Sequence, residues 1–401
     1  MSERKRGRIR DVNKAVLIDP GTPPPQRQYD IDWLRTLAMG AIFLFHCARF
    51  FDDMYWHVKN PDLSHPFTIF VIFTAQWVMP LFFILSGFGV FFALKHRSAA
   101  NFIRERFLRL VVPLVFGIFV LIPPQVYIER LTHDQFIGSF LAFYPHYFDG
   151  WYGLGGNFAW MGLHLWYLEV LFIFSIVLLP FFFWAKSDRG QTLVSRAAAA
   201  SRRPGFVVLL CVPLFFVELL ANTFPGSIGV RDFGGWSPLV YVVFFVVGFL
   251  MAFDDRFGAA FETHRRTWLI LGVTISTAGI TLIETGVLNG LPRLATVPIE
   301  SVLRVFNSWF WLMAILGFGR RYLSFTNRGL AYANRAVLPF YILHQTVIVI
   351  IAFFLIGWAA PVPVKYIALA LVSFAVIVGL YEGVIRRIGV LRFLFGIKKS
   401  R

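Results

Sequence analysis

Two basic side chains, Arg35 and His46, stand in one apolar run of residues 33–51. Their spacing of eleven residues is close to three helical turns, so a helix would present both on one side, separated by about 16 Å. A guanidinium there can hold a phosphate, and a neutral imidazole can take a proton from a hydroxyl and return it to a leaving group. The alternative is an arginine that reaches the interface and a histidine satisfied inside the bundle.

A second apolar run, residues 161–184, carries a carboxylate at Glu169. If this run spans a membrane, Glu169 lies at a depth comparable with that of His46. Such a carboxylate could orient an imidazole or be held neutral by desolvation. It could equally make a structural hydrogen bond to a neighbouring helix.

Arg106 and Arg109 lie three residues apart, on one side of a helix that enters the third apolar run, and Pro113 follows them. Two adjacent guanidinium groups could clamp phosphates or a nucleotide cofactor. The alternative is the ordinary anchoring of a basic segment at the cytoplasmic membrane surface.

Other polar residues in apolar runs give weaker signals. Ser86 and Gly87 are small enough to allow close helix approach, and no motif near Ser86 would activate it as a nucleophile. Tyr341 and His344 share a helix face. We expect Trp166, Tyr341 and His344 to be the substrate-contacting side chains.

The composition indicates the kind of element that must position these groups. Hydrophobic residues make up 57% of the 401 residues and charged residues only 15%, whereas soluble domains are usually about 25% charged. The net charge of +16 is distributed in short clusters between apolar runs, which argues against a nucleic-acid-binding module. Both cysteines, Cys47 and Cys211, lie in apolar runs and form no metal motif, so we expect buried hydrophobic side chains and no bound metal.

Ten runs are long and apolar enough to span a bilayer, which requires about 20 residues. The sequence therefore predicts an all-α, polytopic membrane bundle of about ten transmembrane helices. The predicted runs are residues 33–51, 67–94, 109–127, 161–184, 205–222, 237–253, 267–286, 299–318, 336–358 and 364–385.

The basic residues predict the orientation. Most of the 38 Lys and Arg lie in alternate segments, beginning with the N-terminal one, and such segments face the cytoplasm. We expect a basic, flexible cytoplasmic tail over residues 1–28, a transmembrane domain over 29–385 and a basic cytoplasmic tail over 386–401.

Five motifs occur in an order that resembles the membrane-bound acyltransferase 3 family, and within it the glucan succinyltransferase branch. The resemblance covers residues 30 to about 385. The motifs are D-W-L-R with the histidine eleven residues after its Arg (Asp32–His46), F-F-I-L-S-G-F (Phe82–Phe88), R-F-L-R (Arg106–Arg109), H-L-W-Y-L-E (His164–Glu169) and P-F-Y-I-L-H (Pro339–His344).

The resemblance implies an O-acyltransferase of the bacterial inner membrane. Such an enzyme moves an acetyl or succinyl group from cytoplasmic acyl-CoA to a carbohydrate hydroxyl, with no permanently bound cofactor. It implies that His46, Arg35 and Glu169 are catalytic and that Arg35, Arg106 and Arg109 hold acyl-CoA. His46 would act as a general base or as a transient acyl carrier, and the sequence leaves both open.

Buried basic residues also occur in transporters, so a glycan or lipid transporter without acyl chemistry is the alternative function. The sequence shows no inverted repeat and no paired broken helices, which are features of many transporters. Release of free CoA thiol in the presence of an acceptor distinguishes the two functions, because a transporter leaves the thioester intact.

The first prediction concerns topology. Cysteines introduced by Ser2→Cys and Ser400→Cys should react with a membrane-impermeant maleimide only after the cytoplasmic side is opened, because both flanking segments are rich in Lys and Arg. Labelling of either position from the outer side of intact cells would contradict this orientation.

Overall fold

A computed structural model describes residues 28–95, 97–231 and 234–397 of the chain. In these ranges it is built from helices, and the β-structure consists of two isolated bridges in the 151–158 loop. Eight helices are long and apolar enough to cross a membrane, or up to ten if each of two bent pairs counts as one span. Each of the ten predicted runs overlaps one of these, which confirms the all-α fold. Residues 1–27 of the tail predicted over residues 1–28 lie outside the described residues.

Four spans are uninterrupted helices: α1 (Tyr29–Ala48), α15 (Arg265–Thr285), α16 (Arg293–Tyr322) and α17 (Arg328–Leu355). A fifth, α18 (Val362–Leu380), continues into a π-helical turn, η5 (Tyr381–Ile385). Pro298 lies inside α16 and Pro339 inside α17, and membrane helices tolerate proline at such positions.

Other spans break into shorter helices, often beside proline, which lacks the N–H that would continue the ladder. The pairs are α2 (His65–Ala75) with α3 (Val78–Lys95), and α11 (Pro204–Leu209) with α12 (Val212–Thr223). The two sharply bent spans are η3 (Leu163–Leu165) and α8 (Trp166–Val177) with α9 (Leu179–Ala185), and α13 (Pro238–Met251) with α14 (Asp255–Thr263). Their bends are 55° and 104°.

The span over Ala99–Thr132 is the most irregular. It runs through α4 (Ala99–Arg106), the π-turn η1 (Phe107–Val111), α5 (Val112–Phe116), the π-turn η2 (Gly117–Leu121) and α6 (Pro123–Thr132). Pro113 cannot donate to the carbonyl of Arg109 four residues earlier, and the N–H of Val112 instead reaches Phe107 in π-helical register. Single π-turns of this kind frequently occur at functional sites.

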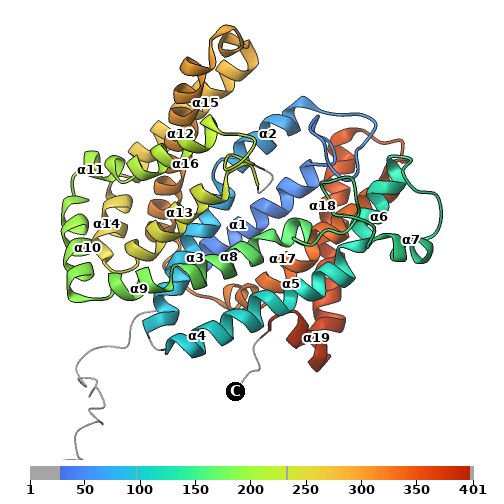
Figure 1. Ribbon diagram of the computed structural model, residues 1–401, viewed down its shortest axis with the longest axis horizontal. Helices are drawn as coiled ribbons and strands as arrows, with labels where there is room; N and C mark the ends of the chain where they lie inside the picture. The colour runs from blue at the N-terminus through green and yellow to red at the C-terminus, as the bar shows by residue number, and fades with distance from the viewer. Residues whose placement is uncertain (1–27, 96, 232–233, 398–401) are drawn as a thin grey trace, which may run out of the picture.

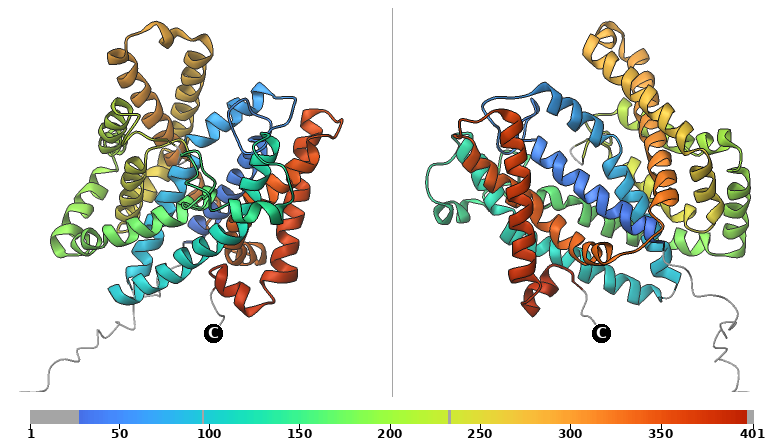
Figure 2. Two further views of the ribbon diagram at one scale, coloured as in Figure 1. Left: turned by 45° about the vertical axis from the view of Figure 1, so that its right-hand side comes forward. Right: turned by 180° about the vertical axis from the view of Figure 1, so that it is seen from behind.

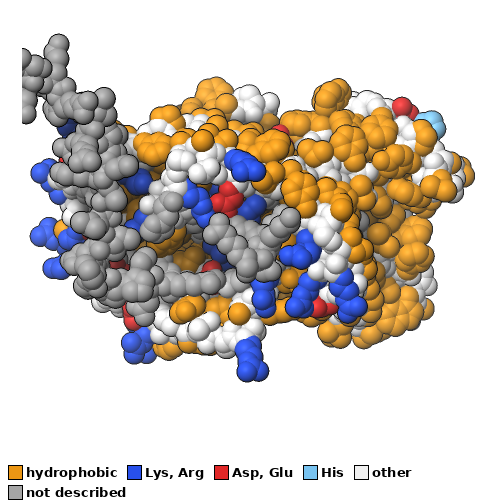
Figure 3. Space-filling view, turned by 90° about the horizontal axis from the view of Figure 1, so that it is seen from below, with side chains coloured by type: hydrophobic (Ala, Val, Ile, Leu, Met, Phe, Trp, Pro, Cys, Tyr) orange, Lys and Arg blue, Asp and Glu red, His pale blue; other side chains and the backbone are white. Residues whose placement is uncertain are grey.

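Four shorter elements complete the described chain. They are α7 (Phe140–His146), α10 (Asp188–Ala200), η4 (Val287–Gly290) and α19 (Gly389–Leu394). Lys and Arg side chains gather on the face seen from below, toward which α4 and α19 lie (Figures 1 and 3).

Helix α1 occupies the middle of the bundle and contacts α2, α3, α16, α17 and α18 (Figure 1). The α15–α16 hairpin extends beyond the other helices in every ribbon view (Figures 1 and 2). Because α1 touches helices from both halves of the sequence, its polar side chains are placed to meet groups from many segments.

Helices α3 and α13 pack with their backbones in contact. A Cβ added at Gly87 would lie 2.3 Å from the carbonyl oxygen of Phe245, and one added at Gly248 would lie 2.1 Å from that of Ile84. Small residues at membrane helix interfaces permit this close approach. The contact agrees with the structural role predicted for Gly87, and it fixes α3, whose Ser86 faces the functional site.

Candidate functional site

A cavity of about 470 Å³ opens between α1, α3, α4, η1, α8 and α17. We call it the arginine cavity, because four guanidinium groups line it. Its polar lining also includes two phenols, a serine, an amide and one carboxylate. The four arginines and these other polar residues are Arg35, Arg97, Arg106, Arg109, Tyr167, Tyr341, Ser86, Asn334 and Glu105.

The arginine cavity carries more positive than negative charge. Arg97 pairs with Glu105 at 2.9 Å, and Arg35 bonds to Asp32 at 3.3 Å. In the described ranges, Arg106 and Arg109 have no carboxylate within ion-pair distance. Glu105, in the same lining, acts electrostatically on both arginines, and the cavity keeps an excess of positive charge that can attract an anion. The sequence predicted Arg35, Arg106 and Arg109 as one group, and the structure brings them to one cavity. Arg97 was missed as a member.

One face of α1 leads from this cavity to His46. Arg35, Met39 and Ile42 line the cavity, and His46 follows four residues later on the same face. The ring of His46 lies beyond the inner end of the cavity, and its centroid is 5.0 Å from the centroid of the His344 ring. The shared face predicted for Arg35 and His46 therefore joins the arginine cavity to an imidazole cluster.

His46, His164 and His344 form this imidazole cluster. The ring of His344 lies 5.1 Å from that of His164, nearly perpendicular to it, and His344 is fully buried. Its Nδ1 donates to the carbonyl oxygen of Tyr341 at 2.5 Å, so the proton of a neutral ring sits on Nδ1 and Nε2 keeps its lone pair.

Two ring nitrogens of the cluster, Nε2 of His344 and Nδ1 of His46, are buried and have no hydrogen-bond partner among the described residues. A buried polar atom without a partner costs about 1–3 kcal/mol, and a catalytic role is one explanation for such an atom. An unprotonated imidazole nitrogen can accept a proton from a hydroxyl, which gives this cluster the capacity for general base catalysis.

Two tyrosines lie between the arginine cavity and the imidazoles. The hydroxyl of Tyr341 donates to the carbonyl oxygen of His164 at 2.5 Å. The hydroxyl of Tyr167 bonds to that of Ser86, also at 2.5 Å. Ser86 therefore pairs with a phenol and not with a base, and the structure gives it no means of activation as a nucleophile.

The structure does not bring Glu169 to the imidazole cluster. Tyr167 on α8 faces the arginine cavity, and Glu169, two residues later, is turned by about 200° around the helix. Its Oε2 is buried without a hydrogen-bond partner, and no ion pair joins it to a histidine in the part of the chain that the structure describes. The prediction for Glu169 rested on its depth in the membrane, and depth gives no direction around the helix axis.

Trp166 also lies outside the lining of the arginine cavity. Its ring stacks on Tyr241 with centroids 5.5 Å apart and lies 6.1 Å from Phe83. Of the three predicted substrate contacts, Tyr341 lines the cavity, His344 belongs to the imidazole cluster and Trp166 packs in the aromatic core.

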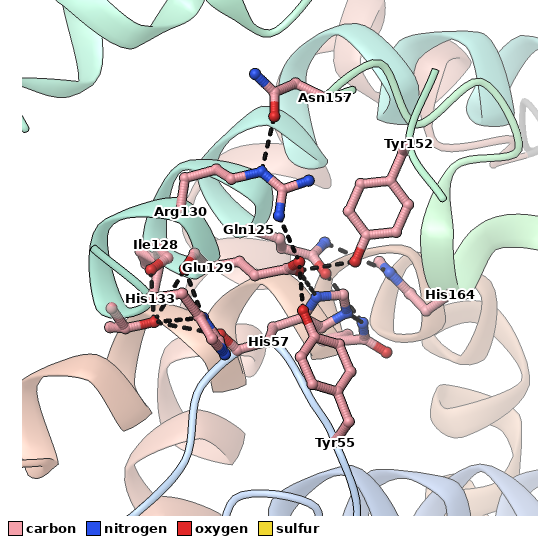
Figure 4. Close-up of polar contacts among 12 residues, drawn as sticks. Tyr55, His57, Gln125, Ile128, Glu129, Arg130, His133, Tyr152, Asn157 and His164 are labelled. Carbon is pink, nitrogen blue, oxygen red and sulfur yellow. Dashed lines mark hydrogen bonds and ion pairs between the residues drawn. The ribbon is translucent and has the colours of Figure 1, made fainter. Parts of the chain in front are cut away.

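A buried carboxylate that sequence reasoning missed lies on the other side of the imidazole cluster. Glu129 on α6 is 1% exposed and accepts hydrogen bonds from Tyr55 at 2.9 Å and Tyr152 at 2.8 Å (Figure 4). It also bonds to Nδ1 of His57 and to Arg130. Burial and the Glu129 charge raise the pKa of Tyr55 to about 12 and raise that of Tyr152, so both hydroxyls keep their protons and donate.

From Glu129, hydrogen bonds continue inward to the imidazole cluster. Gln345 contacts Nε2 of His57 at 3.1 Å and Oε1 of Gln125 at 3.0 Å. Gln125 in turn contacts Nδ1 of His164 at 3.4 Å (Figure 4). We call Glu129, His57, Gln345, Gln125 and Thr346 the outer network. Gln125 and Glu129 are four residues apart, which places both on one face of α6, and this spacing in the sequence could have indicated that they belong to one polar site.

The loop over residues 49–64 covers the imidazole cluster on the side of the outer network. Its Trp56 is 7% exposed and stacks on His46 with centroids 6.4 Å apart. Asp52 holds the loop closed, since it pairs with Arg49 at 2.8 Å and with Lys59 at 2.7 Å. Burial is the larger effect on Asp52 and raises its pKa despite both cations.

Comparisons with known proteins agree with the predicted resemblance. The model of the acyltransferase 3 family, described as an acyltransferase domain, matches residues 28–382. The chain is similar to the glucans biosynthesis protein C of Salmonella heidelberg (strain SL476) and that of Salmonella typhi, with 24% identity over 385 residues in each case. These alignments cover 94% of this chain and 96% of each relative. No solved structure matches the chain.

The second prediction concerns the cover that Trp56 makes over His46. In a chain with His46→Cys, and with Cys47 and Cys211 replaced by Ala, an impermeant maleimide added on the side of the 49–64 loop should react slowly. Trp56→Ala should accelerate the reaction, because the stacked ring no longer shields position 46. Trp160→Ala, which removes an exposed tryptophan, is the control. Equal labelling rates with and without Trp56 would contradict the cover.

Proposed function

We propose, from the premise that this chain belongs to the acyltransferase 3 family, that it transfers an acetyl or succinyl group from acyl-CoA to a carbohydrate hydroxyl. The observation that carries the proposal is the continuous face of α1, which joins the arginine cavity to the unpartnered nitrogen of His46. A polyanion-binding site thus leads directly to a base. The family membership establishes a membrane acyltransferase, and the donor, acceptor and residue roles are our proposal.

The chemistry of the arginine cavity supports acyl-CoA as the donor. Coenzyme A carries a pyrophosphate and a further phosphate, which suit the guanidinium groups of Arg35, Arg106 and Arg109. The apolar lining of Met39 and Ile42 suits the arm that carries the thioester. Arg35 and His46 lie about 16 Å apart along α1, and an extended pantetheine arm covers that distance.

In the proposed reaction, His46 takes the proton of the acceptor hydroxyl as its oxygen attacks the thioester carbonyl. The bond between carbonyl carbon and sulfur breaks, and the imidazolium returns the proton to the departing thiolate. An acyl-histidine intermediate would use the same nitrogen as a nucleophile. In both versions His46 must present a lone pair, which its buried, unpartnered Nδ1 can supply.

Two observations support a carbohydrate acceptor. The similar proteins carry a name that refers to glucans. Beside the outer network, Trp151 and Trp160 are 54% and 43% exposed and lie 6.2 Å apart, and exposed aromatic rings can cover the apolar faces of sugars. We place the protein in a bacterial inner membrane, with the arginine cavity facing the cytoplasmic pool of acyl-CoA.

The third prediction tests the donor site. Arg106→Ala and Arg109→Ala should each weaken acyl-CoA binding by roughly tenfold to a hundredfold, because a charge-assisted contact contributes about 1.5–3 kcal/mol. Binding of acyl-CoA to purified protein measures the effect. Arg104→Ala is the matched control, since Arg104 lies on α4 with Arg106 but outside the cavity lining. Unchanged affinity in both cavity variants would assign this segment to membrane anchoring alone.

The fourth prediction tests the base. His46→Ala should reduce acyl transfer by at least about a hundredfold, the usual contribution of a general base. His46→Gln should fail as well, because an amide forms hydrogen bonds but accepts no proton at neutral pH. His65→Ala, which changes an exposed histidine, should retain activity. Transfer is measured as CoA thiol released in the presence of acceptor. Near-normal release by His46→Ala in a properly inserted protein would overturn the proposed function.

A further inference from the structure

The outer network begins at a carboxylate that has no free acceptor position. Oε1 of Glu129 accepts from Tyr55 and Arg130, and Oε2 accepts from Tyr152 and His57. An ionised carboxylate can only accept, so the Nδ1 atom of His57 must carry the ring proton of the neutral imidazole. Glu129 therefore determines which tautomer His57 adopts, as carboxylate partners of histidines commonly do.

That tautomer fixes the direction of the next hydrogen bonds. With its proton on Nδ1, His57 accepts at Nε2 from the side-chain amide of Gln345, at 3.1 Å. The same amide nitrogen donates to Oε1 of Gln125 at 3.0 Å. Both hydrogens of Gln345 are thereby used, and its orientation is set by partners on two other segments.

The network ends at the imidazole cluster. The amide nitrogen of Gln125 lies 2.7 Å from the hydroxyl of Thr346, 3.4 Å from Nδ1 of His164 and 3.5 Å from the carbonyl oxygen of Leu121. Nε2 of His164 donates to the carbonyl oxygen of Ile342 at 3.2 Å, and this bond fixes the tautomer of His164 because a carbonyl can only accept. The ionised Glu129 therefore sets the tautomer of His57 and the orientation of Gln345, and the network reaches His164 through Gln125.

These bonds hold the part of α17 that presents His344. Ile342 and Tyr341 bond to His164, and Gln345 and Thr346 bond to Gln125. His344 lies between these anchored residues. The ring of His164 packs edge-on against that of His344, and Gln345, the next residue on α17, is held by His57 and Gln125, so the position of His344 depends on residues that the outer network contacts.

We propose that Glu129 is a positioning residue, which acts through His57, Gln345, Gln125 and His164 to hold His344 against His46. The proposal rests on the proposed function, because it assigns to the network the task of ordering the reactive imidazoles. The network is not a path for protons between the outer surface and His46. Two of its members are amides, which donate and accept hydrogen bonds but do not exchange protons readily at neutral pH.

The fifth prediction tests this role with Glu129→Gln in the purified full-length protein. The neutral amide can donate as well as accept, so His57 is free to adopt either tautomer and the orientation of Gln345 is no longer fixed. We expect kcat for acyl transfer to fall by roughly tenfold to a hundredfold, as is typical when a group that orients a functional histidine is removed. The KM for acyl-CoA should not change, because the arginine cavity is separate from the network.

Glu284→Gln is the matched control. It removes the same charge from another carboxylate that contacts a histidine, His65 at 3.0 Å, but this pair is exposed and lies outside the outer network. Its kcat should equal that of the unmodified protein. The double variant Glu129→Gln/His57→Gln should lose no more activity than His57→Gln alone, because both changes interrupt one chain of contacts.

Three results would overturn the inference. They are an unchanged kcat in Glu129→Gln, losses that multiply in the double variant, and a parallel loss of kcat, acyl-CoA binding and melting temperature, which would show a purely structural role. If His46→Ala abolishes transfer while Glu129→Gln does not alter it, the positioning role fails alone. If His46→Ala keeps its activity, the proposed function itself fails.

Discussion

A hydrocarbon environment offers no water to satisfy polar groups, so a buried polar side chain needs a partner within the protein. The described chain largely follows this constraint. Oε1 of Glu218 accepts from Arg231 and Arg304, although its Oε2 has no partner among the described residues, and Lys365 donates to Asn60 at 2.8 Å. Against this background the free nitrogens of His46 and His344 are informative, because they belong to rings in contact with each other. A site that the protein leaves unsatisfied at considerable cost is a site that a substrate can satisfy.

The same constraint explains why the two sides of the imidazole cluster differ. In the arginine cavity, Arg106 and Arg109 form no ion pair with another described residue, which suits an anionic ligand that enters and leaves. The outer network satisfies Glu129 completely, which suits a fixed support. Replacing a buried ionic group with apolar residues of similar size is often neutral or stabilising, so stability alone is a poor reason for keeping Glu129. A requirement for one ordered arrangement of the imidazoles supplies a better reason.

Local patterns in the sequence were sufficient for part of this arrangement. Apolar length predicted the ten runs, and the spacing of Arg35 and His46 predicted their shared face, since both depend on one helix. The outer network joins His57 to Gln345 over 288 residues and to Glu129 over 72, and helical periodicity carries no information about such pairs. Glu169 shows the converse. Its predicted depth came from its own helix, but its direction depends on how α8 packs against neighbours.

One irregular span connects the two sides of the proposed reaction. Its first part, α4 with η1, supplies Arg106 and Arg109 to the arginine cavity, and its last part, α6, supplies Gln125 and Glu129 to the outer network. A uniform α-helix would fix the angle between these two pairs by their sequence separation alone. The two π-turns, η1 and η2, each place more residues in one turn than an α-helix does, and this alters the angle. The interruptions that make this span a poor helix therefore allow one segment to face a donor site at one end and to order the imidazole cluster from the other.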